Sequence, residues 1–318
     1  MRAAVCPEYG PPEVVRLDEL PSPVPAAGQV RVRVGGAAVN FPDVLLVAGR
    51  YQVAVPPPFV PGSEFAGVVD QVGADVDEFA VGDRVTGTGL VGAFADEVVA
   101  PVTALTRIPH GVHDHVAAAF GVAHRTAQHA LRSVARLQPG ERLVVLGAGG
   151  GVGLAAVQLG VVHGATVTAV ASSPEKLAAA ASYGAADLVD HRAGDLRAAL
   201  RDGADVVLDP VGGALAEPAL RSLRPGGRFV TVGYASGTIP RIPLNLVLVK
   251  DVQVHGVNLR NIAARDPAGF RRDEAELVEL LVGGRISPHI SEVLPLEETA
   301  AALRLVADGR AIGKIVIA

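Results

Sequence analysis

The residues with the clearest chemical use form a glycine turn that starts at Gly147, within the stretch Leu143-Val-Val-Leu-Gly-Ala-Gly-Gly-Gly-Val-Gly153. An apolar segment precedes this turn and an Ala-rich segment follows it. A glycine turn between a strand and a helix lets the backbone approach a pyrophosphate closely, and the helix N-terminus offers free N–H groups to the phosphates. We therefore predict a dinucleotide site here. Its residues are Ala148, Gly149, Gly150, Gly151, Val152 and Gly153.

Polar residues after the next predicted strand, residues 165–171, indicate which dinucleotide binds. An NAD site usually carries Asp or Glu at this point to hold the ribose 2′-hydroxyl. This chain instead carries Ser172, Ser173 and Lys176, and hydroxyl and ammonium groups suit a 2′-phosphate. We predict NADPH as the cofactor, with these three residues as ligands of its 2′-phosphate. Two alternatives stay open: Ser173 also fits the N-cap of the next helix, and Glu175 can reach toward the ribose.

Two further turns follow predicted strands. Val211 lies in the turn Asp209-Pro-Val-Gly-Gly213 after residues 206–208, and Gly233 and Tyr234 follow residues 228–232. Ligands of open α/β sheets bind at the C-terminal ends of the strands, so we expect these residues to border the cofactor. For Tyr234, ordinary turn chemistry is the alternative.

These sites need a sheet to position them, and the pattern of apolar segments predicts one. Strand-like and helix-like segments alternate from residue 143 to about residue 259, which indicates an α/β fold with a doubly wound parallel sheet. Residues 1–120 instead contain short alternating segments separated by Gly and Pro, typical of a barrel-like β domain.

The composition excludes several classes of protein. The chain has 318 residues, 49% of them hydrophobic, with a net charge of −5, so nucleic acid is not an expected partner. The apolar runs are too short to span a bilayer, and the N-terminus lacks a signal-peptide pattern. Cys6 is the only cysteine, so no intramolecular disulfide forms. We therefore expect a cytoplasmic protein that does not bind membranes.

Several motifs, taken together, carry a resemblance to a known family. They are Val39-Asn-Phe-Pro-Asp43, Gly49-Arg-Tyr51, Phe59-Val-Pro-Gly-Ser-Glu-Phe-Ala-Gly67, the glycine turn with Gln158, Asp209-Pro-Val-Gly-Gly213 and Gly313-Lys314. With these motifs the chain resembles the zinc-independent medium-chain dehydrogenase/reductases, in the NADPH:quinone oxidoreductase (zeta-crystallin-like) family.

The resemblance implies a fold and an assembly. It implies a GroES-like β-barrel catalytic domain built from residues 1–120 and 263–318, and a Rossmann NADPH-binding domain over residues 121–262. The cofactor would lie between the two domains. It also implies a homodimer formed through the edge strand from Val252 to Val257.

The resemblance also argues against a metal. Zinc-dependent relatives place Cys where Asn40 stands and His where Ser63 stands, while Glu64 is kept. One carboxylate beside an amide and a hydroxyl does not make a tetrahedral zinc site. We therefore expect no catalytic metal.

Three residues at positions that line the cleft in this family are the catalytic candidates. Asn40 and Tyr51 can each donate a hydrogen bond to a carbonyl oxygen, and Asp43 would orient a partner or the ribose. Each has a structural alternative: Asn40 satisfies buried backbone, Asp43 caps a helix, and Tyr51 packs. The resemblance also places Thr126 toward the nicotinamide, and it places His191 where some members contact the 2′-phosphate.

The expected function is an NADPH-dependent reductase that transfers hydride to quinones or other α,β-unsaturated carbonyl compounds. A second hypothesis is an enoyl-thioester reductase acting on acyl-CoA or a carrier protein. Arg125, Arg260, Arg271 and Arg272 would then contact the phosphates of the thioester carrier. A third hypothesis is an NADPH-binding protein with little turnover.

Overall fold

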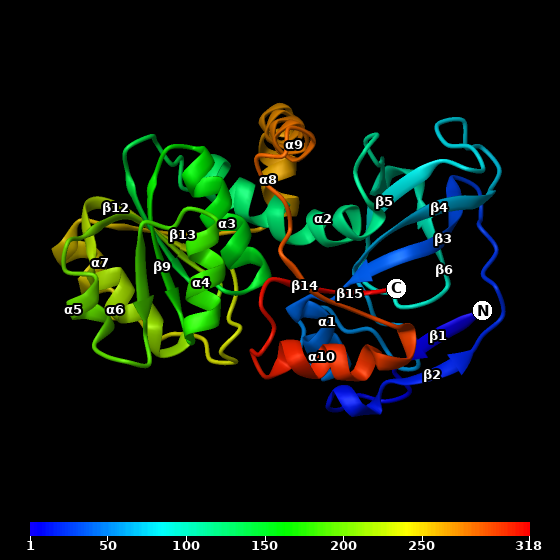
Figure 1. Cartoon of the computed structure of the whole chain (residues 1–318), viewed down its shortest axis with the longest axis horizontal. Helices are drawn as coiled ribbons and strands as arrows, with labels where there is room; N and C mark the ends of the chain where they lie inside the picture. Colours follow the sequence, from blue (N-terminus) through cyan, green and yellow to red (C-terminus); the bar gives the residue numbers. More distant parts are fainter. The chain divides into compact units, whose positions relative to one another are not determined.

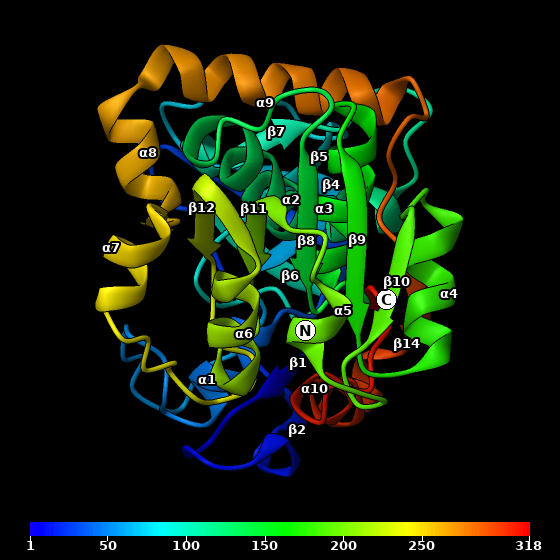
Figure 2. The same cartoon turned by 90° about the vertical axis from the view of Figure 1, so that its left-hand side faces the viewer.

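Six parallel strands form the sheet that carries the glycine turn. The computed structural model describes all residues, Met1–Ala318. The order across this sheet is β10–β9–β8–β11–β12–β13, visible for most strands in Figure 2. The strands are β8 (Arg142–Leu146), β9 (Thr166–Ala171), β10 (Asp187–Asp190), β11 (Ala204–Asp209), β12 (Leu223–Thr231) and β13 (Gln253–Gly256). The order reverses between β8 and β11, as in a doubly wound sheet, so the predicted α/β fold is confirmed.

Helices cover both faces of this sheet (Figure 1). One face carries α3 (Gly151–Val162) and α4 (Pro174–Ser182), and the other carries α5 (Leu196–Ala199), α6 (Ala216–Arg221) and α7 (Asn245–Lys250). Helix α3 is apolar almost all round, and its residues from Gly153 to Gly160 are buried. A helix of this composition needs cover on every side, which explains its central position over the sheet.

The mixed sheet of the other part of the chain contains seven strands, most of them antiparallel. Strand β3 (Gln29–Ala38) is its centre and pairs with β4 (Glu64–Val72), β6 (Glu97–Pro101) and β15 (Lys314–Ile317). Alternation explains β3, because Val30 and Val32 are buried while Arg31 and Arg33, which follow them, are more exposed. The remaining strands are β5 (Arg84–Thr88), β7 (Leu105–Arg107) and β14 (Ile290–Leu294), and β1 (Arg2–Val5) and β2 (Arg16–Glu19) form a separate pair.

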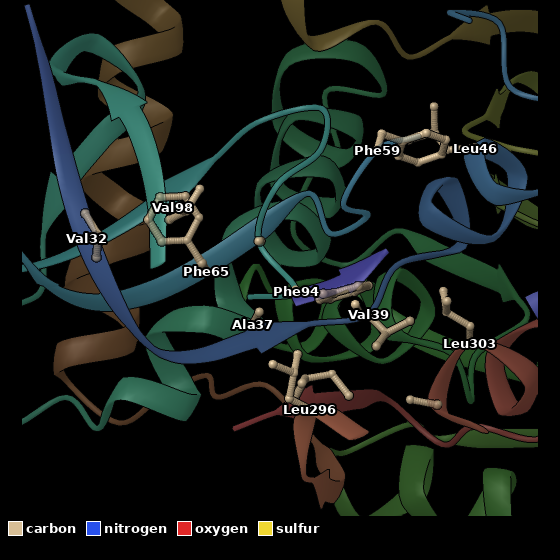
Figure 3. Close-up of a cluster of buried hydrophobic side chains, with 14 of the residues drawn as sticks. Val32, Ala37, Val39, Leu46, Phe59, Phe65, Phe94, Val98, Leu296 and Leu303 are labelled. Carbon is tan, nitrogen blue, oxygen red and sulfur yellow. The ribbon is translucent and has the colours of Figure 1, made fainter. Parts of the chain in front are cut away.

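The last strand, β15, is what brings the C-terminal segment into this sheet. It pairs antiparallel with β3 and parallel with β14, and all four of its residues are buried. Helix α10 (Thr299–Ala307) packs beside α1 (Phe41–Val47). Figure 3 shows Leu296 and Leu303 from this segment in the same apolar cluster as Val39 and Phe94. Apolar burial therefore joins the two ends of the chain in one core.

The chain divides into two compact units, residues 1–122 with 290–318 (unit 1) and residues 123–289 (unit 2). The second division falls after residue 289, whereas the sequence predicted it after residue 262. Helix α9 (Pro267–Val282) explains the difference, because it packs in unit 2. There Glu274 bonds the ring of His129, at the end of α2 (Asp114–His129), at 3.0 Å, and Asp273 accepts from Ser133 at 2.7 Å. Helix α8 (Leu259–Arg265) packs on α9 and belongs to the same unit.

None of the helices combines the length and the apolar character that crossing a membrane requires.

Candidate active site

The glycine turn lies at the reversal point of the parallel sheet, as the motif requires. Gly147 follows β8 with φ +61°, a left-handed conformation that favours glycine. A Cβ on Gly147 would lie 2.6 Å from Cγ2 of Val211, which follows β11. The turns after β8 and β11 therefore touch, on either side of the crevice where doubly wound sheets bind nucleotides.

The first turn of α3 packs directly on the glycine turn. A Cβ on Gly153 would lie 2.1 Å from the carbonyl oxygen of Gly147, closer than any side chain can approach. Gly150 is the N-cap of α3, and it has no side chain to occupy the free N–H groups behind it. The helix N-terminus is therefore held close to the turn and left open to an anion.

Lys176 lies over this turn. A Cβ on Gly149 would meet the Cβ and Cγ atoms of Lys176 at 2.5 Å, so the absence of a side chain makes room for the lysine stem. Burial lowers the pKa of Lys176, and the nearby Arg192 guanidinium lowers it further. The charged form of Lys176 would therefore be stabilised by an anion bound beside it.

Ser173 is the N-cap of α4, and its hydroxyl accepts a hydrogen bond from the backbone N–H of Lys176 at 3.4 Å. The Ser173 hydroxyl also lowers the pKa of the exposed Glu175 carboxylate. The capping alternative therefore applies to Ser173, while Ser172 is half-buried and directly follows β9.

His191 comes to the same place from the end of β10. Its backbone N–H donates to the carbonyl oxygen of Ala171 at 3.1 Å, next to Ser172. Burial lowers the pKa of His191, and the charges of Arg192 and Lys176 add to this effect while Asp190 opposes it. Ser172, Lys176 and His191 thus converge at the C-terminal ends of β9 and β10.

The structure locates the other predicted cofactor residues on the same unit. The ring of Tyr234 packs over Gly212, whose Cβ would lie 2.8 Å from Cδ1 of the tyrosine, so turn packing accounts for part of its position. Gly233 is half-buried and precedes it after β12. Thr126 is half-buried on α2, away from the strand ends in sequence.

In unit 1, a buried ion pair lies beside Asn40, one of the catalytic candidates. Lys314 Nζ donates to Glu64 Oε1 at 2.7 Å, to Asn40 Oδ1 at 2.6 Å and to the carbonyl oxygen of Val39 at 2.9 Å. The side chains of Lys314 and Glu64 are 4% and 1% exposed. The second carboxylate oxygen of Glu64 accepts from the backbone N–H of Val122 at 2.8 Å. Both charges are therefore paired and fully hydrogen-bonded, the condition under which buried charges are tolerated.

Asn40 is committed to this network. Its amide nitrogen donates to Glu64 at 2.9 Å and to Ser63 Oγ and the carbonyl oxygen of Ala38 at 3.3 Å each, while its oxygen accepts from Lys314. An amide has only two hydrogens to donate, and here they already have acceptors. This geometry favours a positioning role for Asn40 over direct donation to a substrate.

Asp43 is fully buried in the first turn of α1. Its Oδ2 accepts from the backbone N–H of Asn40 at 2.7 Å, which is the helix-capping alternative. Its Oδ1 has no partner at ordinary hydrogen-bond geometry, although the Ser63 hydroxyl is near enough to influence the pKa. Burial raises the pKa of Asp43 to about 7, and the Glu64 charge contributes to the rise. Tyr51 is half-buried against the apolar core of unit 1, in agreement with its packing alternative.

The donor set does not fit a zinc ion. Asn40 and Ser63 offer neutral oxygen and nitrogen atoms, and the ammonium of Lys314 already holds Oε1 of Glu64. No group of three or more His, Cys, Asp or Glu side chains in the structure is placed to hold a metal ion. Zinc needs thiolate, imidazole or carboxylate ligands in tetrahedral arrangement, and of the two carboxyl groups near Asn40, Glu64 is paired with Lys314 and Asp43 holds the backbone N–H of Asn40.

Two protein-family models match the chain, one in each unit. Residues 26–110 match the family described as "Alcohol dehydrogenase GroES-like domain", and residues 151–282 match "Zinc-binding dehydrogenase". Quinone oxidoreductase-like protein 2 of Bos taurus is 38% identical over 322 residues, which cover 99% of this chain and 92% of that protein. The chain belongs to the quinone oxidoreductase family of medium-chain dehydrogenase/reductases.

Two further relatives extend this result. The quinone oxidoreductase of Thermus thermophilus, solved also as its complex with NADPH, superimposes with a TM-score of 0.86 at 34% identity, covering 100% of this chain and 99% of that one. A mycocerosic acid synthase-like polyketide synthase of Mycobacterium tuberculosis is 31% identical over 314 residues, which cover 96% of this chain but 15% of that protein. As the sequence predicted, the fold of this quinone oxidoreductase family member combines a GroES-like unit with a Rossmann-type unit.

Sequence reasoning missed three functional candidates in this family member. Arg192 was not assigned to the phosphate site, although its charge acts on both Lys176 and His191. Lys314 was recognised only as part of a motif, and Ser63 only as a departure from zinc ligands. The basic residue next to His191 was the available signal for Arg192, whereas the partners of Lys314 lie 250 and more positions away in sequence.

We predict that Gly153→Ala disrupts the cofactor site. The added methyl group would overlap the carbonyl oxygen of Gly147, so the helix must move away from the turn. The Kd for NADPH, measured by fluorescence titration, should rise at least about tenfold, and the melting temperature should fall. The control is Gly194→Ala in the same unit, because no atom lies within 4 Å of the added Cβ. Equal effects of the two substitutions would contradict this explanation.

We predict that Lys314→Met destabilises the protein by about 3–5 kcal/mol, because it leaves the buried Glu64 charge without its partner. Urea unfolding followed by circular dichroism measures the loss. The double variant Glu64→Gln with Lys314→Met removes both charges and should recover part of the free energy of unfolding. If the double variant is less stable than Lys314→Met alone, the charge of Glu64 is not the cause.

Proposed function

We propose that the protein is an NADPH-dependent reductase that transfers hydride to quinones or other α,β-unsaturated carbonyl compounds, without a metal. The observation that carries the proposal is the cationic position beside the glycine turn, where Lys176 covers Gly149 and the charge of Arg192 lowers the pKa of both Lys176 and His191. Membership of the quinone oxidoreductase family gives the reaction class. That the acceptor is a quinone and that no metal takes part are our own proposals within this reaction class.

The cofactor choice rests on charge at the end of β9. NADPH differs from NADH by a 2′-phosphate, which needs cations and hydroxyl donors. Ser172, Lys176, His191 and Arg192 provide them, and the glycine turn with the N-terminus of α3 would hold the pyrophosphate. When bound, the dihydronicotinamide supplies the hydride.

Unit 1 would supply the groups around the substrate oxygen. Reduction of a conjugated carbonyl develops negative charge on oxygen, and this charge must be stabilised by hydrogen bonds. Asn40, Asp43 and Tyr51 remain our candidates, with Asn40 acting by position because its hydrogens are engaged. Asn40 and Ser63 stand where zinc-dependent relatives carry ligands, so we propose that hydrogen bonding replaces the metal.

A second candidate function is enoyl-thioester reduction. The similarity to a polyketide synthase region supports it, because such enzymes handle acyl chains. The structure limits the contacts expected for the carrier phosphates: Arg125 pairs with Glu274 at 2.8 Å, and Arg272 contacts Asp273 at 3.3 Å. Arg260 and Arg271 remain for that role. An NADPH-binding protein with little turnover is the third candidate.

The first experiment compares initial rates of NADPH and NADH oxidation with 1,4-benzoquinone and with crotonyl-CoA, each corrected for the reaction without enzyme. Quinone-dependent oxidation that favours NADPH, and that survives dialysis against a chelator, is the expected result. Activity with crotonyl-CoA alone would move the function to acyl-chain reduction. Inactivation by the chelator with recovery on adding zinc would refute the metal-free reaction, and tight NADPH binding without turnover would favour the third candidate.

We predict that Lys176→Ala selectively weakens NADPH binding. Loss of one charge-assisted contact to the 2′-phosphate should raise the Kd for NADPH by about 10- to 100-fold. NADH lacks that phosphate, so its Kd should change by about twofold or less. Isothermal titration calorimetry measures both constants. An equal loss for the two cofactors would exclude Lys176 as a 2′-phosphate ligand.

We also propose that the protein forms a homodimer through the edge strand. Strand β13 pairs only with β12, so its other edge is unpaired. Apolar side chains near it are exposed: Leu244 and Leu248 at 82%, Val249 at 77% and Val254 at 47%. Exposed apolar groups next to an unpaired strand edge are typical of a surface that another chain covers.

We predict that Leu248→Asp converts the dimer to a monomer, because the carboxylate would be buried without a partner at the interface. Light scattering coupled to gel filtration gives the mass in solution. The control is Val24→Asp, since Val24 is 76% exposed in unit 1, far along the sequence from β13. A wild-type protein that is monomeric at micromolar concentration would refute the dimer itself.

A further inference from the structure

One buried carboxyl group in unit 2 has no cation to balance it. Asp209 ends β11, and its side chain is completely buried. Its Oδ1 accepts from the backbone N–H groups of Val211 and Gly212 at 2.8 Å each, whereas its Oδ2 has no hydrogen-bond partner. Burial raises the pKa of this carboxyl group and the two donors lower it, and no charged side chain adds to these effects. No side-chain cation therefore compensates a charge on Asp209.

The turn after β11 does not by itself require a carboxylate at this position. An asparagine would offer an equivalent oxygen to the two N–H groups and would bring no charge into the interior. The register partner of Asp209 on β12 is Thr231, and its buried hydroxyl oxygen also has no partner, so this neighbour does not satisfy Oδ2. A buried charge without a partner is costly, and such groups are concentrated at functional sites.

We propose that the charge of Asp209 stabilises the positive charge that the nicotinamide ring gains when the cofactor gives up its hydride. This role deepens the proposed reductase function and rests on it, because that function requires hydride to leave the nicotinamide. Asp209 would act through space, so neither of its oxygens has to touch the ring. The sequence predicted Val211 of the same turn as a cofactor residue and assigned no role to Asp209.

The cationic position after β9 indicates which way the cofactor lies along the sheet. The 2′-phosphate belongs to the adenosine half of NADPH, and its proposed ligands follow β9 and β10. The pyrophosphate would lie at the glycine turn, which follows β8. The order across the sheet is β9–β8–β11–β12, so the nicotinamide half would extend toward β11 and β12. Asp209 ends β11 and therefore lies where this half is expected.

Backbone contacts hold Asp209 beside the glycine turn. A Cβ on Gly147 would lie 2.6 Å from Cγ2 of Val211, two residues after Asp209. The carbonyl oxygen of Asp209 accepts from the backbone N–H of Val232 at 2.8 Å, directly after β12. The carboxyl group is therefore attached to the turns that follow both β11 and β12. A charge that is fixed and buried acts more strongly than one in water, because little solvent screens it.

Hydride transfer changes the charge that Asp209 would face. A C–H bond of the reduced nicotinamide breaks, and its two electrons form a new C–H bond at the electron-poor carbon of the acceptor. The ring passes from neutral to singly positive, and the acceptor gains a negative charge that a proton from water neutralises. A fixed negative charge near the ring favours the oxidised cofactor over the reduced one, and it lowers the barrier to hydride departure for the same reason.

The test measures the binding of NADP⁺ and NADPH to the wild type and to Asp209→Asn by isothermal titration calorimetry. It is run at about pH 8, so that a carboxyl group with a raised pKa is still ionised. Asp209→Asn should raise the Kd for NADP⁺ by about 5- to 20-fold and the Kd for NADPH by about twofold or less. The two cofactors carry the same phosphates and riboses, so a general disturbance of the site would change both constants alike.

Two further variants separate charge from structure. Asp205→Asn is the matched control, because Asp205 lies near the other end of β11 and also accepts a backbone N–H, that of Arg142 at 2.8 Å. It should leave the ratio of the two Kd values unchanged. Asp209→Ser repeats the test with a different side chain, since a hydroxyl can hold the same turn without a charge. It should give the same selective loss of NADP⁺ binding.

Equal changes of the two constants in Asp209→Asn and Asp209→Ser, or no change in either, would refute the electrostatic role and leave the reductase function intact. An equal shift of the ratio in Asp205→Asn would refute it as well, because the effect would not depend on the position of the charge. A wild type that reduces no acceptor would refute the proposed function, whereas the ratio of the two constants would still decide on the charge of Asp209.

Discussion

The buried contact between Lys314 and Glu64 ties together the parts of the chain on which unit 1 depends. Lys314 begins the last strand, Glu64 begins β4, Asn40 caps α1, and Val122 belongs to α2. An ammonium in an apolar core is tolerated only where all its hydrogens find acceptors, so the pair specifies how these four segments meet. Apolar packing alone would tolerate small displacements, whereas this network does not. The register of β15 against β3 and the place of the capping residue therefore follow from one charge pair.

Unit 2 depends instead on close backbone approach. Gly147, Gly149 and Gly153 each lie where a Cβ would overlap another group, and the three overlaps involve the turn after β11, the lysine on α4 and the turn after β8. The same contacts bring the N-terminus of α3, the cation on α4 and the reversal of strand order to one point. Phosphate binding and tight packing therefore both require glycine at these positions. For this reason the nucleotide-binding motif of unit 2 could be predicted from the sequence, whereas the hydrogen-bond network of unit 1 could not.

The sequence predicted the parallel sheet and most of its strands correctly, because apolar runs broken by glycine turns are local signals. The N-cap role of Ser173 was also readable, since Pro174 follows it and the cap depends only on neighbours. The boundary between the units after residue 289 could not be predicted, because the sequence of helix α9 is that of an ordinary amphipathic helix. Its assignment to unit 2 depends on Asp273 and Glu274 meeting Ser133 and His129, which lie 140 and 145 positions away. Contacts between side chains so far apart in the chain produce no hydrophobic periodicity from which they could be predicted.

The cluster around Asn40 also depends on contacts that the sequence alone could not predict. Asn40 and Asp43 became candidates because they match positions that line the cleft in the family that the sequence resembles. The Asn40 amide donates to Glu64 and Ser63 and accepts from Lys314, so it has no hydrogen left for a substrate. The carboxyl oxygen of this cluster without a hydrogen-bond partner is Oδ1 of Asp43. Chemistry at this site is therefore decided by which groups remain unsatisfied after the buried charges have been paired. That remainder is a property of the folded arrangement, because the cation that determines it comes from the far end of the chain.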